Sequence, residues 1–226
     1  MLLNKMKSRL LFATALAAGG AALPAYAETP VAVSIGAGTT GFGGELQVKT
    51  NDYLSFRGGY HHLGISHEDD YDGINYDGDL TFSNVSLIAD LHPFKNSFVI
   101  SAGAYIGDKK IEAIGSSATN VEIGGQVFTP EQAGILELNA EMDDVAPFAG
   151  LGFDTTFQGE GRWGFKLIAG AIFAGEPELT LVSRDGIFSD DPNFIALVEE
   201  ERLEIQEELE DFEIIPVVEA GISFRF

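Results

Sequence analysis

Residues 212–226, FEIIPVVEAGISFRF, alternate between two kinds of side chain over almost their whole length. One set of alternate positions is apolar throughout and consists of Phe212, Ile214, Pro216, Val218, Ala220, Ile222, Phe224 and Phe226. The other set carries all the charges, at Glu213, Glu219 and Arg225. Because successive side chains of a β-strand point to opposite faces, this period of two predicts a strand with one apolar face and one charged face.

The same alternation recurs along the rest of the chain. It is clearest in FGGELQVK (42–49), LSFRGGY (54–60), SLIADLH (86–92), FVISAGAYI (98–106) and WGFKLIAGAIF (163–173). No stretch after residue 27 has the roughly 20 consecutive apolar residues that a membrane-spanning helix needs. A water-soluble β-sandwich would also alternate, so the pattern alone does not choose between a sandwich and a membrane barrel.

The connections between these segments alternate between short and long. The short ones are KTNDY (49–53), LHPFKNS (91–97) and TFQGEGRW (156–163). The long, polar ones are residues 67–75, 113–137 and 184–211. Bacterial outer-membrane barrels have short periplasmic turns and longer extracellular loops, so the order of connections favours a barrel.

Aromatic residues gather beside the short connections, as the girdle of a membrane barrel would. They are Tyr53, Phe94, Phe98, Phe157, Trp163, Phe165 and Phe226. Ordinary core aromatics are the alternative, but a sandwich gives no reason for this placement. We therefore predict an all-β fold, an eight-stranded antiparallel up-and-down transmembrane barrel with one helix on the extracellular side.

The eight predicted strands lie near residues 31–38, 41–50, 53–67, 76–92, 97–112, 138–157, 162–183 and 212–226. The count depends on GTTG at residues 38–41, where the apolar phase switches between neighbouring segments. One long strand with a bulge is the alternative to a tight turn at Gly38–Gly41. The turn is favoured because it gives an even number of strands and places both ends of the barrel on one side.

The N-terminal segment predicts export. Lys5, Lys7 and Arg9 precede an apolar run, and AYA at residues 25–27 has the small-x-small pattern of a cleavage site. The expected domains are a signal peptide over residues 1–27, cleaved after Ala27, and a barrel over residues 28–226 with a helical insertion at about 191–211. Removing three basic and no acidic residues changes the net charge from −22 to −25, which argues against nucleic-acid binding. The chain has no cysteine, so neither disulfides nor a lipidated cysteine are expected.

Four stretches are similar to segments of a widespread, largely uncharacterised proteobacterial group of barrels. They are NDYLSFRGGY (51–60), LIADLHPF (87–94), ISAGAYIGDKKI (100–111) and GRWGFKLIAGAIF (161–173). The chain thus resembles the small outer-membrane β-barrel proteins of Gram-negative bacteria, such as OmpW, OmpX and the OmpA membrane domain. The resemblance implies the fold and a location in the cell outer membrane, and its motifs bring no catalytic residues.

Charged residues occupy the expected inward face of the barrel. They are Glu45, Lys49, Arg57, Asp90, Asp154, Lys166, Glu219 and Arg225. An eight-stranded barrel is just wide enough to be filled by side chains or to hold one small ligand. We therefore expect interlocking ion pairs that fill the lumen, with a charged conduit as the alternative, and a cost for Arg225→Ala if the charge left behind is buried.

Two polar motifs are weighed as sites, and neither yields a catalytic, cofactor-binding or metal-binding residue. HHLGISHE (61–68) offers histidines, a serine and a glutamate, but alternation puts His62 and Ser66 on one face and His61 and His67 on the other. HEDDYDGINYDGD (67–79) is rich in carboxylates from Glu68 to Asp79, without the spacing of a calcium loop. We therefore predict a protein that is not an enzyme and has no cofactor, and leave divalent-cation binding at the acidic segment open.

The segment DDPNFIALVEEERLEIQEELEDF (190–212) predicts a helix that begins near Pro192. Its expected apolar stripe, formed by Ile195, Val198, Ile205, Leu209 and Phe212, is predicted to pack on the barrel rim or mouth. The predicted function is a structural or surface-interaction role in the envelope, with a ligand site or conduit and a lipid-modifying enzyme as alternatives. The expected partners are outer-membrane lipid, lipopolysaccharide and the barrel-assembly machinery, which would read the strand ending at Phe226.

Overall fold

The structure, a computed structural model, describes residues 30–71, 74–117 and 119–226. The expected signal peptide over residues 1–27 lies outside the described residues.

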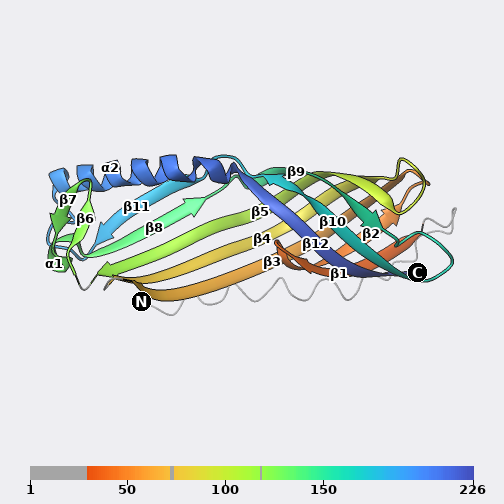
Figure 1. The fold of residues 1–226 in the computed structure, drawn as a ribbon, viewed down its shortest axis with the longest axis horizontal. Coiled ribbons are helices and arrows are strands. Elements are labelled where there is room, and N and C mark those ends of the chain that lie inside the picture. Colours follow the sequence, from red (N-terminus) through yellow and green to blue (C-terminus); the bar gives the residue numbers. More distant parts are fainter. Residues whose placement is uncertain (1–29, 72–73, 118) are drawn as a thin grey trace, which may run out of the picture.

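Eight antiparallel strands close into a barrel, as the sequence predicts (Figure 1). They are β1 (Val31–Gly38), β2 (Gly41–Lys49), β3 (Leu54–Tyr71), β4 (Ile74–Leu91), β5 (Phe98–Ser117), β9 (Val145–Asp154), β10 (Trp163–Phe173) and β12 (Ile214–Arg225). Closure joins the first strand to the last, with Val33 opposite Phe224, and joins β5 to β9. Each barrel strand therefore has a hydrogen-bonded neighbour on both sides.

The predicted tight turn at residues 38–41 is confirmed. Gly38 and Gly41 are Cα partners, so only Thr39 and Thr40 connect β1 to β2. Gly41 has a φ of 89°, and a Cβ there would lie 2.1 Å from the carbonyl oxygen of His62. Only glycine fits this turn without strain, which explains why the apolar phase switches here.

The short connections lie at the same end of the barrel as the C-terminus. The backbone N–H of Phe226 donates to the carbonyl oxygen of Val31 over 3.0 Å, which places the two barrel ends side by side. Aromatic rings meet at this end, as expected for a girdle: Phe94 contacts Phe98, and Trp163 contacts Phe224. The predicted even strand count with adjacent ends is therefore confirmed.

Beyond the opposite end of the barrel, five strands form an open sheet that we call the extension (left half of Figure 1). It contains residues 63–71 of β3, 74–82 of β4 and 107–117 of β5, together with β8 (Ile135–Glu141) and β11 (Glu178–Arg184). The expected loop over residues 67–75 is therefore wrong: β3 and β4 stay paired as far as Tyr71 opposite Ile74. Cross-strand hydrogen bonds satisfy the backbone there in spite of the polar composition.

Two predicted strands are each divided in two. Residues 138–157 form β8 and β9 with a break after Glu141, and residues 162–183 form β10 and β11 with a break after Phe173. In the second break Gly175 has a φ of 73°, and Pro177 has no N–H to donate. The breaks mark the level where the barrel ends and the extension begins.

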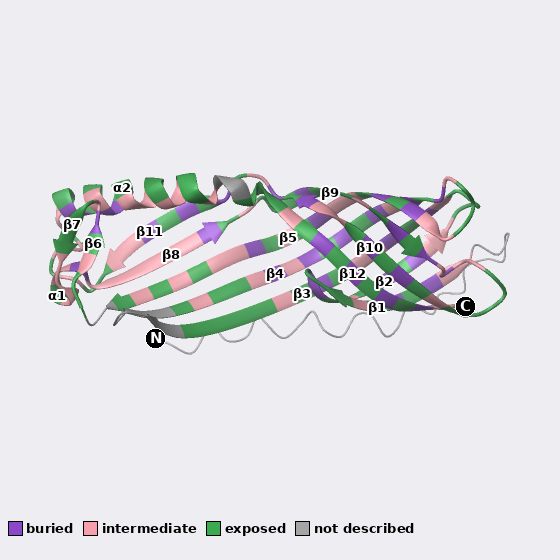
Figure 2. Ribbon diagram, in the orientation of Figure 1, coloured by how far each residue is buried: buried purple, intermediate pink, exposed green. Residues whose placement is uncertain are grey.

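The extension has one apolar and one polar face because strand alternation continues unchanged from the barrel. Ile65, Leu80, Ile111, Ala140 and Leu179 are successive Cα partners across its five strands, on the face that continues the lumen. The next row of Cα partners toward the barrel lies on the opposite face and consists of Gly64, Thr81, Lys110, Glu141 and Glu178. Figure 2 shows the alternation of buried and exposed residues in the barrel strands.

The expected long loop over residues 113–137 is largely ordered. After β5 come a hairpin of β6 (Val121–Ile123) and β7 (Gln126–Phe128) and the short helix α1 (Pro130–Ala133). These elements lie at the tip of the extension, next to the start of α2 (Figure 1).

The predicted helix is present as α2 (Pro192–Leu209), followed by the 3₁₀ turn η1 (Glu210–Glu213). The N–H groups of Asn193 and Phe194 donate to Asp191 at 2.8 and 3.3 Å, which lowers the pKa of the Asp191 carboxyl from its ordinary value. Pro192 in the first helical turn leaves no further donor unsatisfied. No helix within the described ranges has the length and hydropathy needed to cross a membrane.

Helix α2 packs along the extension rather than on the barrel mouth. It buries Phe194 and Val198, and the ring of Phe194 contacts Phe128 of β7 at 4.8 Å between centroids. Ile195, expected in the apolar stripe, is 51% exposed. Val198 and Ile205 of the predicted stripe do pack inward, against a cluster that includes Ile123 of the β6–β7 hairpin and Leu181 of β11.

The edge of β11 is closed by α2 side chains. The Arg202 guanidinium donates to the carbonyl oxygen of Leu179 at 3.4 Å, and the Gln206 amide donates to that of Pro177 at 3.0 Å. An exposed strand edge invites pairing with other chains, so this contact protects the extension.

We expect Phe194→Ala to release α2 while the barrel stays closed. A buried Phe-to-Ala change costs about 3–5 kcal/mol, and the cost falls on α2 and the tip because Phe194 makes no barrel contact among the ring pairs described. Hydrogen exchange should speed up in α2 amides and stay slow in β1 and β12. The matched control is Ile195→Ala, at the next residue on the exposed side of α2, which should leave hydrogen exchange unchanged in both regions. Equally faster exchange of α2 in the two variants would contradict the packing described.

Candidate functional site in the barrel lumen

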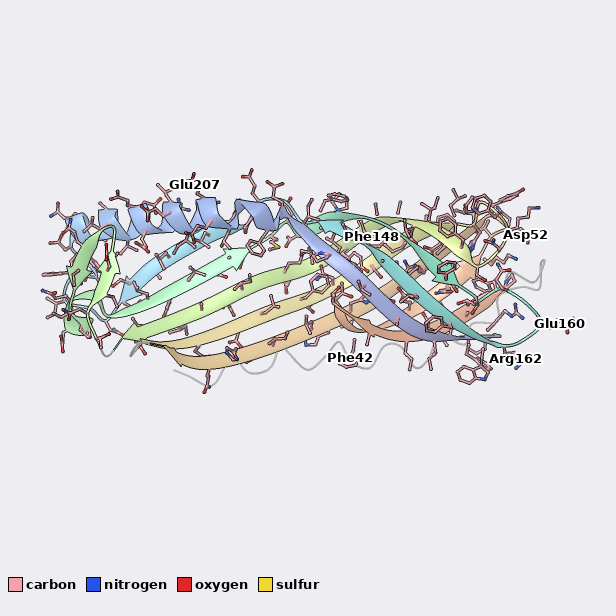
Figure 3. All side chains as sticks on the ribbon, in the orientation of Figure 1. Phe42, Asp52, Phe148, Glu160, Arg162 and Glu207 are labelled. Carbon is pink, nitrogen blue, oxygen red and sulfur yellow. The ribbon has the colours of Figure 1, made fainter. Side chains whose placement is uncertain are left out.

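The lumen is the only part of the barrel where described polar and titratable side chains converge out of contact with solvent. Figure 3 contrasts Phe148, which points into the barrel, with Phe42, which projects outward and is 77% exposed. From the end with the short turns upward, the lumen holds a polar layer, an ionic layer and an apolar layer.

The ionic layer is built around the carboxylate of Glu45 on β2. Arg57 of β3 donates from Nη1 to Glu45 Oε1 at 2.8 Å and from Nε to Asp90 Oδ2 at 2.7 Å. Lys166 of β10 contacts Glu45 Oε2 and lies 2.7 Å from Glu219 Oε1. The five side chains come from five strands and are all nearly fully buried, so the layer ties the two sides of the barrel together.

Neighbouring hydroxyl groups add hydrogen bonds to two carboxylates of this layer. Ser101 donates to Asp90 Oδ1 at 2.5 Å, and Ser34 donates to Glu45 Oε2 at 3.1 Å. Buried charges persist when they are both paired and hydrogen-bonded. Glu45 and Asp90 therefore meet both conditions, whereas Nη2 of Arg57 is buried without a hydrogen-bond partner.

His61 connects the ionic layer to the apolar layer above it. Its Nε2 lies 3.0 Å from Ser86 Oγ, and its ring centroid lies 5.4 Å from that of Tyr105. A Cβ at Gly43 would come within 2.5 Å of His61 Nδ1, so the glycine leaves room for the imidazole. The ring fills the cross-section at this level.

The apolar layer closes the lumen toward the extension. Tyr105 of β5 lies between Phe82 of β4 and Phe148 of β9, with ring centroids 6.0 and 5.5 Å away. Aliphatic side chains pack around these rings and complete one buried cluster with Ile88, Val99, Ala146, Ile168, Ile172, Ala174 and Val217. Partly buried Leu63 and Met142 extend this cluster toward the inner face of the extension.

The polar layer occupies the end with the short turns. Ser55 Oγ lies 3.4 Å from His92 Nε2, and Thr156 Oγ1 lies 2.7 Å from Ser223 Oγ. The N–H of Thr156 donates to Asp154 Oδ1 at 2.7 Å. All three layers are thus occupied by side chains that contact one another.

Six of the eight charged residues predicted to face inward are buried in the lumen. The exceptions are Lys49, which pairs with Asp52 in the turn at 2.9 Å, and Arg225, which donates to the carbonyl oxygens of Gly159 and Gly161. Both lie at the barrel end, where strand alternation continues but the enclosing wall does not. The expectation that Arg225 holds a buried partner charge is therefore not met.

The motif HHLGISHE does not assemble a triad in the described structure. His61 is buried in the lumen, His62 is exposed on the outer surface, and Ser66 donates to Asp79 on the polar face of the extension. The faces are those that alternation predicts, and they separate the groups that catalysis would need together.

The described residues of the acidic segment, 68–71 and 74–79, lie on paired strands, with Glu68 opposite Asp77 and Ser66 opposite Asp79. A different group, which sequence reasoning missed, brings possible ligand atoms of Glu45, His61 and Glu219 within 4.8 Å of one another. Lys166 already lies against both carboxylates, so an ammonium group supplies the positive charge there. Glu45 and His61 come from consecutive strands and Glu219 from the last strand, so no spacing motif could have revealed the group.

We expect Arg57→Ala to destabilise the barrel by about 3–5 kcal/mol, because it leaves Glu45 and Asp90 buried without their shared cation. Arg225→Ala is the matched control at the exposed barrel end, and its expected loss of stability is about 1 kcal/mol or less. Urea unfolding of both variants in detergent, followed by heat-modifiable gel mobility, measures the difference. Equal midpoints for the two variants would show that the ionic layer does not support the barrel.

Comparison with known proteins supports the class that this geometry indicates. No protein-family model matches the chain, and no curated protein sequence matches it. The chain is similar to the crystal structure of Acinetobacter baumannii CarO2, with 26% identity, a TM-score of 0.59, and coverage of 88% of this chain and 99% of that one. It is similarly related to Acinetobacter baumannii CarO, with 27% identity, a TM-score of 0.56, and coverage of 87% and 98%. The closed barrel and these likenesses lead to one conclusion: the chain is a small outer-membrane β-barrel protein.

Proposed function

We propose that this protein is a non-enzymatic barrel of the outer membrane with a sealed lumen, serving envelope structure or surface interaction. The observation that carries the proposal is the stack of three side-chain layers, in which the ionic layer joins five strands. Opposite charges in direct contact and a ring cluster above them leave no continuous path for hydrated ions.

The outer surface of the barrel suits a lipid environment. Exposed apolar side chains cover it, among them Ile35, Phe42, Leu46, Phe56, Leu87, Leu151, Phe165 and Ile222. With the termini in the periplasm, the extension and α2 would stand outside the cell, where lipopolysaccharide is the neighbouring lipid. Lipid and lipopolysaccharide are therefore the proposed partners of the exterior, and signal-peptide cleavage after Ala27 remains part of the proposal.

We expect the purified barrel to show no steady ion conductance in planar bilayers, since side chains occupy the lumen from end to end. The recording should match protein-free bilayers under the same voltage and salt. Stable channels of one reproducible size would defeat the sealed-lumen proposal in favour of a conduit.

The absence of lipid-modifying activity is tested separately. Lipid A from vesicles incubated with the barrel should keep the mass that it has in protein-free vesicles, because Ser66 donates to Asp79 and no hydrogen bond described for it reaches a histidine that could complete a triad. A shifted lipid A mass that disappears in Ser66→Ala would establish the enzyme instead.

The last strand is the proposed recognition element for the barrel-assembly machinery. Phe226 is 71% exposed and contacts Phe224 at 5.6 Å between ring centroids, so its packing contribution is small. The apolar face of β12 points outward along the whole strand, as expected of a strand that an assembly factor binds. A role in recognition would make Phe226 more important in cells than in the folded barrel.

We expect Phe226→Ala to refold in detergent like the parent but to accumulate poorly in outer membranes. The variant keeps the backbone hydrogen bond to Val31, so only the ring is lost. The matched control is Phe94→Ala, which removes a ring of equal exposure, 70%, from a turn at the same barrel end. Immunoblots of membrane fractions should show loss for Phe226→Ala alone, whereas equal behaviour of the two variants would reduce Phe226 to a surface residue.

A further inference from the structure

A second concave site lies outside the lumen, between α2 and the apolar face of the extension. The pocket has a volume of about 370 Å³, within the range typical of small-ligand sites. Its walls come from five places in the sequence that the fold brings together: β5, the β6–β7 hairpin, β8, β11 and α2. The apolar side chains that line it are Ala113, Val121, Leu136, Leu138, Leu181 and Ile205.

The pocket exists because α2 covers only part of the apolar sheet face. The first turns of α2 close over the tip, where Phe194 and Val198 are buried with Ile123, Ala133 and Leu181. Further along, α2 lies over β11, and it leaves β5 and β8 uncovered. Leu136 and Leu138 remain only partly buried there, and Ile65 and Leu80 of the same face are exposed.

The charged groups of the pocket are acidic, and Asn120 is a neutral polar residue of its lining. Glu122 of β6 and Glu201 of α2 both line it, and no lysine or arginine does so among the described residues. Glu201 Oε2 accepts a hydrogen bond from the N–H of Gly124 at 3.0 Å, which fixes its carboxylate at the pocket. The one basic residue of α2, Arg202, pairs instead with Glu199 at 2.8 Å.

We propose that this pocket binds a cationic amphiphile, a molecule with an alkyl or aryl body and an ammonium group. The body would displace water from the leucine and isoleucine walls, and the ammonium group would meet Glu122 and Glu201. Charge complementarity excludes fatty acids and other anionic amphiphiles, which would bring a second negative charge to these carboxylates. The site is independent of the sealed lumen, so binding requires no passage through the barrel.

The test uses n-octylammonium, n-octanol and octanoate added to the barrel in lipid nanodiscs, with methyl-labelled Ile and Leu followed by NMR. Methyl signals of Leu136, Leu138, Leu181 and Ile205 should shift with n-octylammonium. Binding should weaken about fourfold for each methylene removed, so n-hexylammonium, two methylenes shorter, should bind about fifteenfold more weakly than n-octylammonium. Octanol should bind about fivefold more weakly than n-octylammonium, and octanoate more weakly still.

Separate variants test the apolar walls of the pocket and its two carboxylates. Ala113→Phe fills the pocket and should reduce n-octylammonium binding at least tenfold, whereas Ile114→Phe, on the opposite face of β5, should leave it unchanged. Glu122→Gln with Glu201→Gln should make n-octylammonium and octanol bind equally, since glutamine keeps an acceptor for Gly124 but not the charge.

Each contrary result rejects the proposal. If octanol or octanoate bound the parent as tightly as n-octylammonium does, the pocket would have no preference for cations. If Ala113→Phe and Ile114→Phe bound n-octylammonium equally well, the binding site would not be this pocket. Should Ala113→Phe fail to fold, shifts in the parent confined to methyls outside the pocket would reject it as well. None of these outcomes bears on the conductance of the lumen, so the sealed-lumen proposal is tested independently of the pocket.

Discussion

Closure of the strand ring is the constraint on which the rest of this structure depends. In the hydrocarbon layer no water is present to satisfy backbone N–H and C=O groups, so every barrel strand needs a partner on both sides. Pairing of β1 with β12 supplies the last of these partners. The tight turn at Gly41, the adjacent barrel ends and the outward apolar residues are all consequences of a ring that must close within one chain.

A ring of only eight strands encloses little space, and that space decides the chemistry of the inward side chains. Charged residues in so narrow a lumen contact one another directly, and Arg57 and Lys166 share the carboxylate of Glu45. The desolvation cost of each charge is offset by its partners and by hydroxyl groups such as that of Ser101. The same small radius lets three aromatic rings close the upper end.

Above the barrel the ring opens, and different rules apply. β3, β4 and β5 continue with β8 and β11, while β1, β2 and β12 do not reach this level. The inward face, apolar here, loses the opposite wall that covered it in the barrel. Helix α2 and the β6–β7 hairpin replace that wall in part, which leaves the pocket between α2 and β5 and makes the extension the part of the molecule best suited to interaction.

Sequence by itself determined the fold class, the eight strands, the turn at Gly38–Gly41, six of the eight inward charges and the residue range of α2. These follow from local periodicity and turn chemistry, which each strand carries in its own residues. Tertiary structure alone decided that residues 67–71 pair as a strand with β4, that Ile195 faces solvent while Phe194 is buried, and that Arg225 lies outside the ionic layer. It also brought together Glu45, His61 and Glu219, and the walls of the α2 pocket, because contacts between distant strands depend on register and barrel radius, which no short stretch of sequence contains.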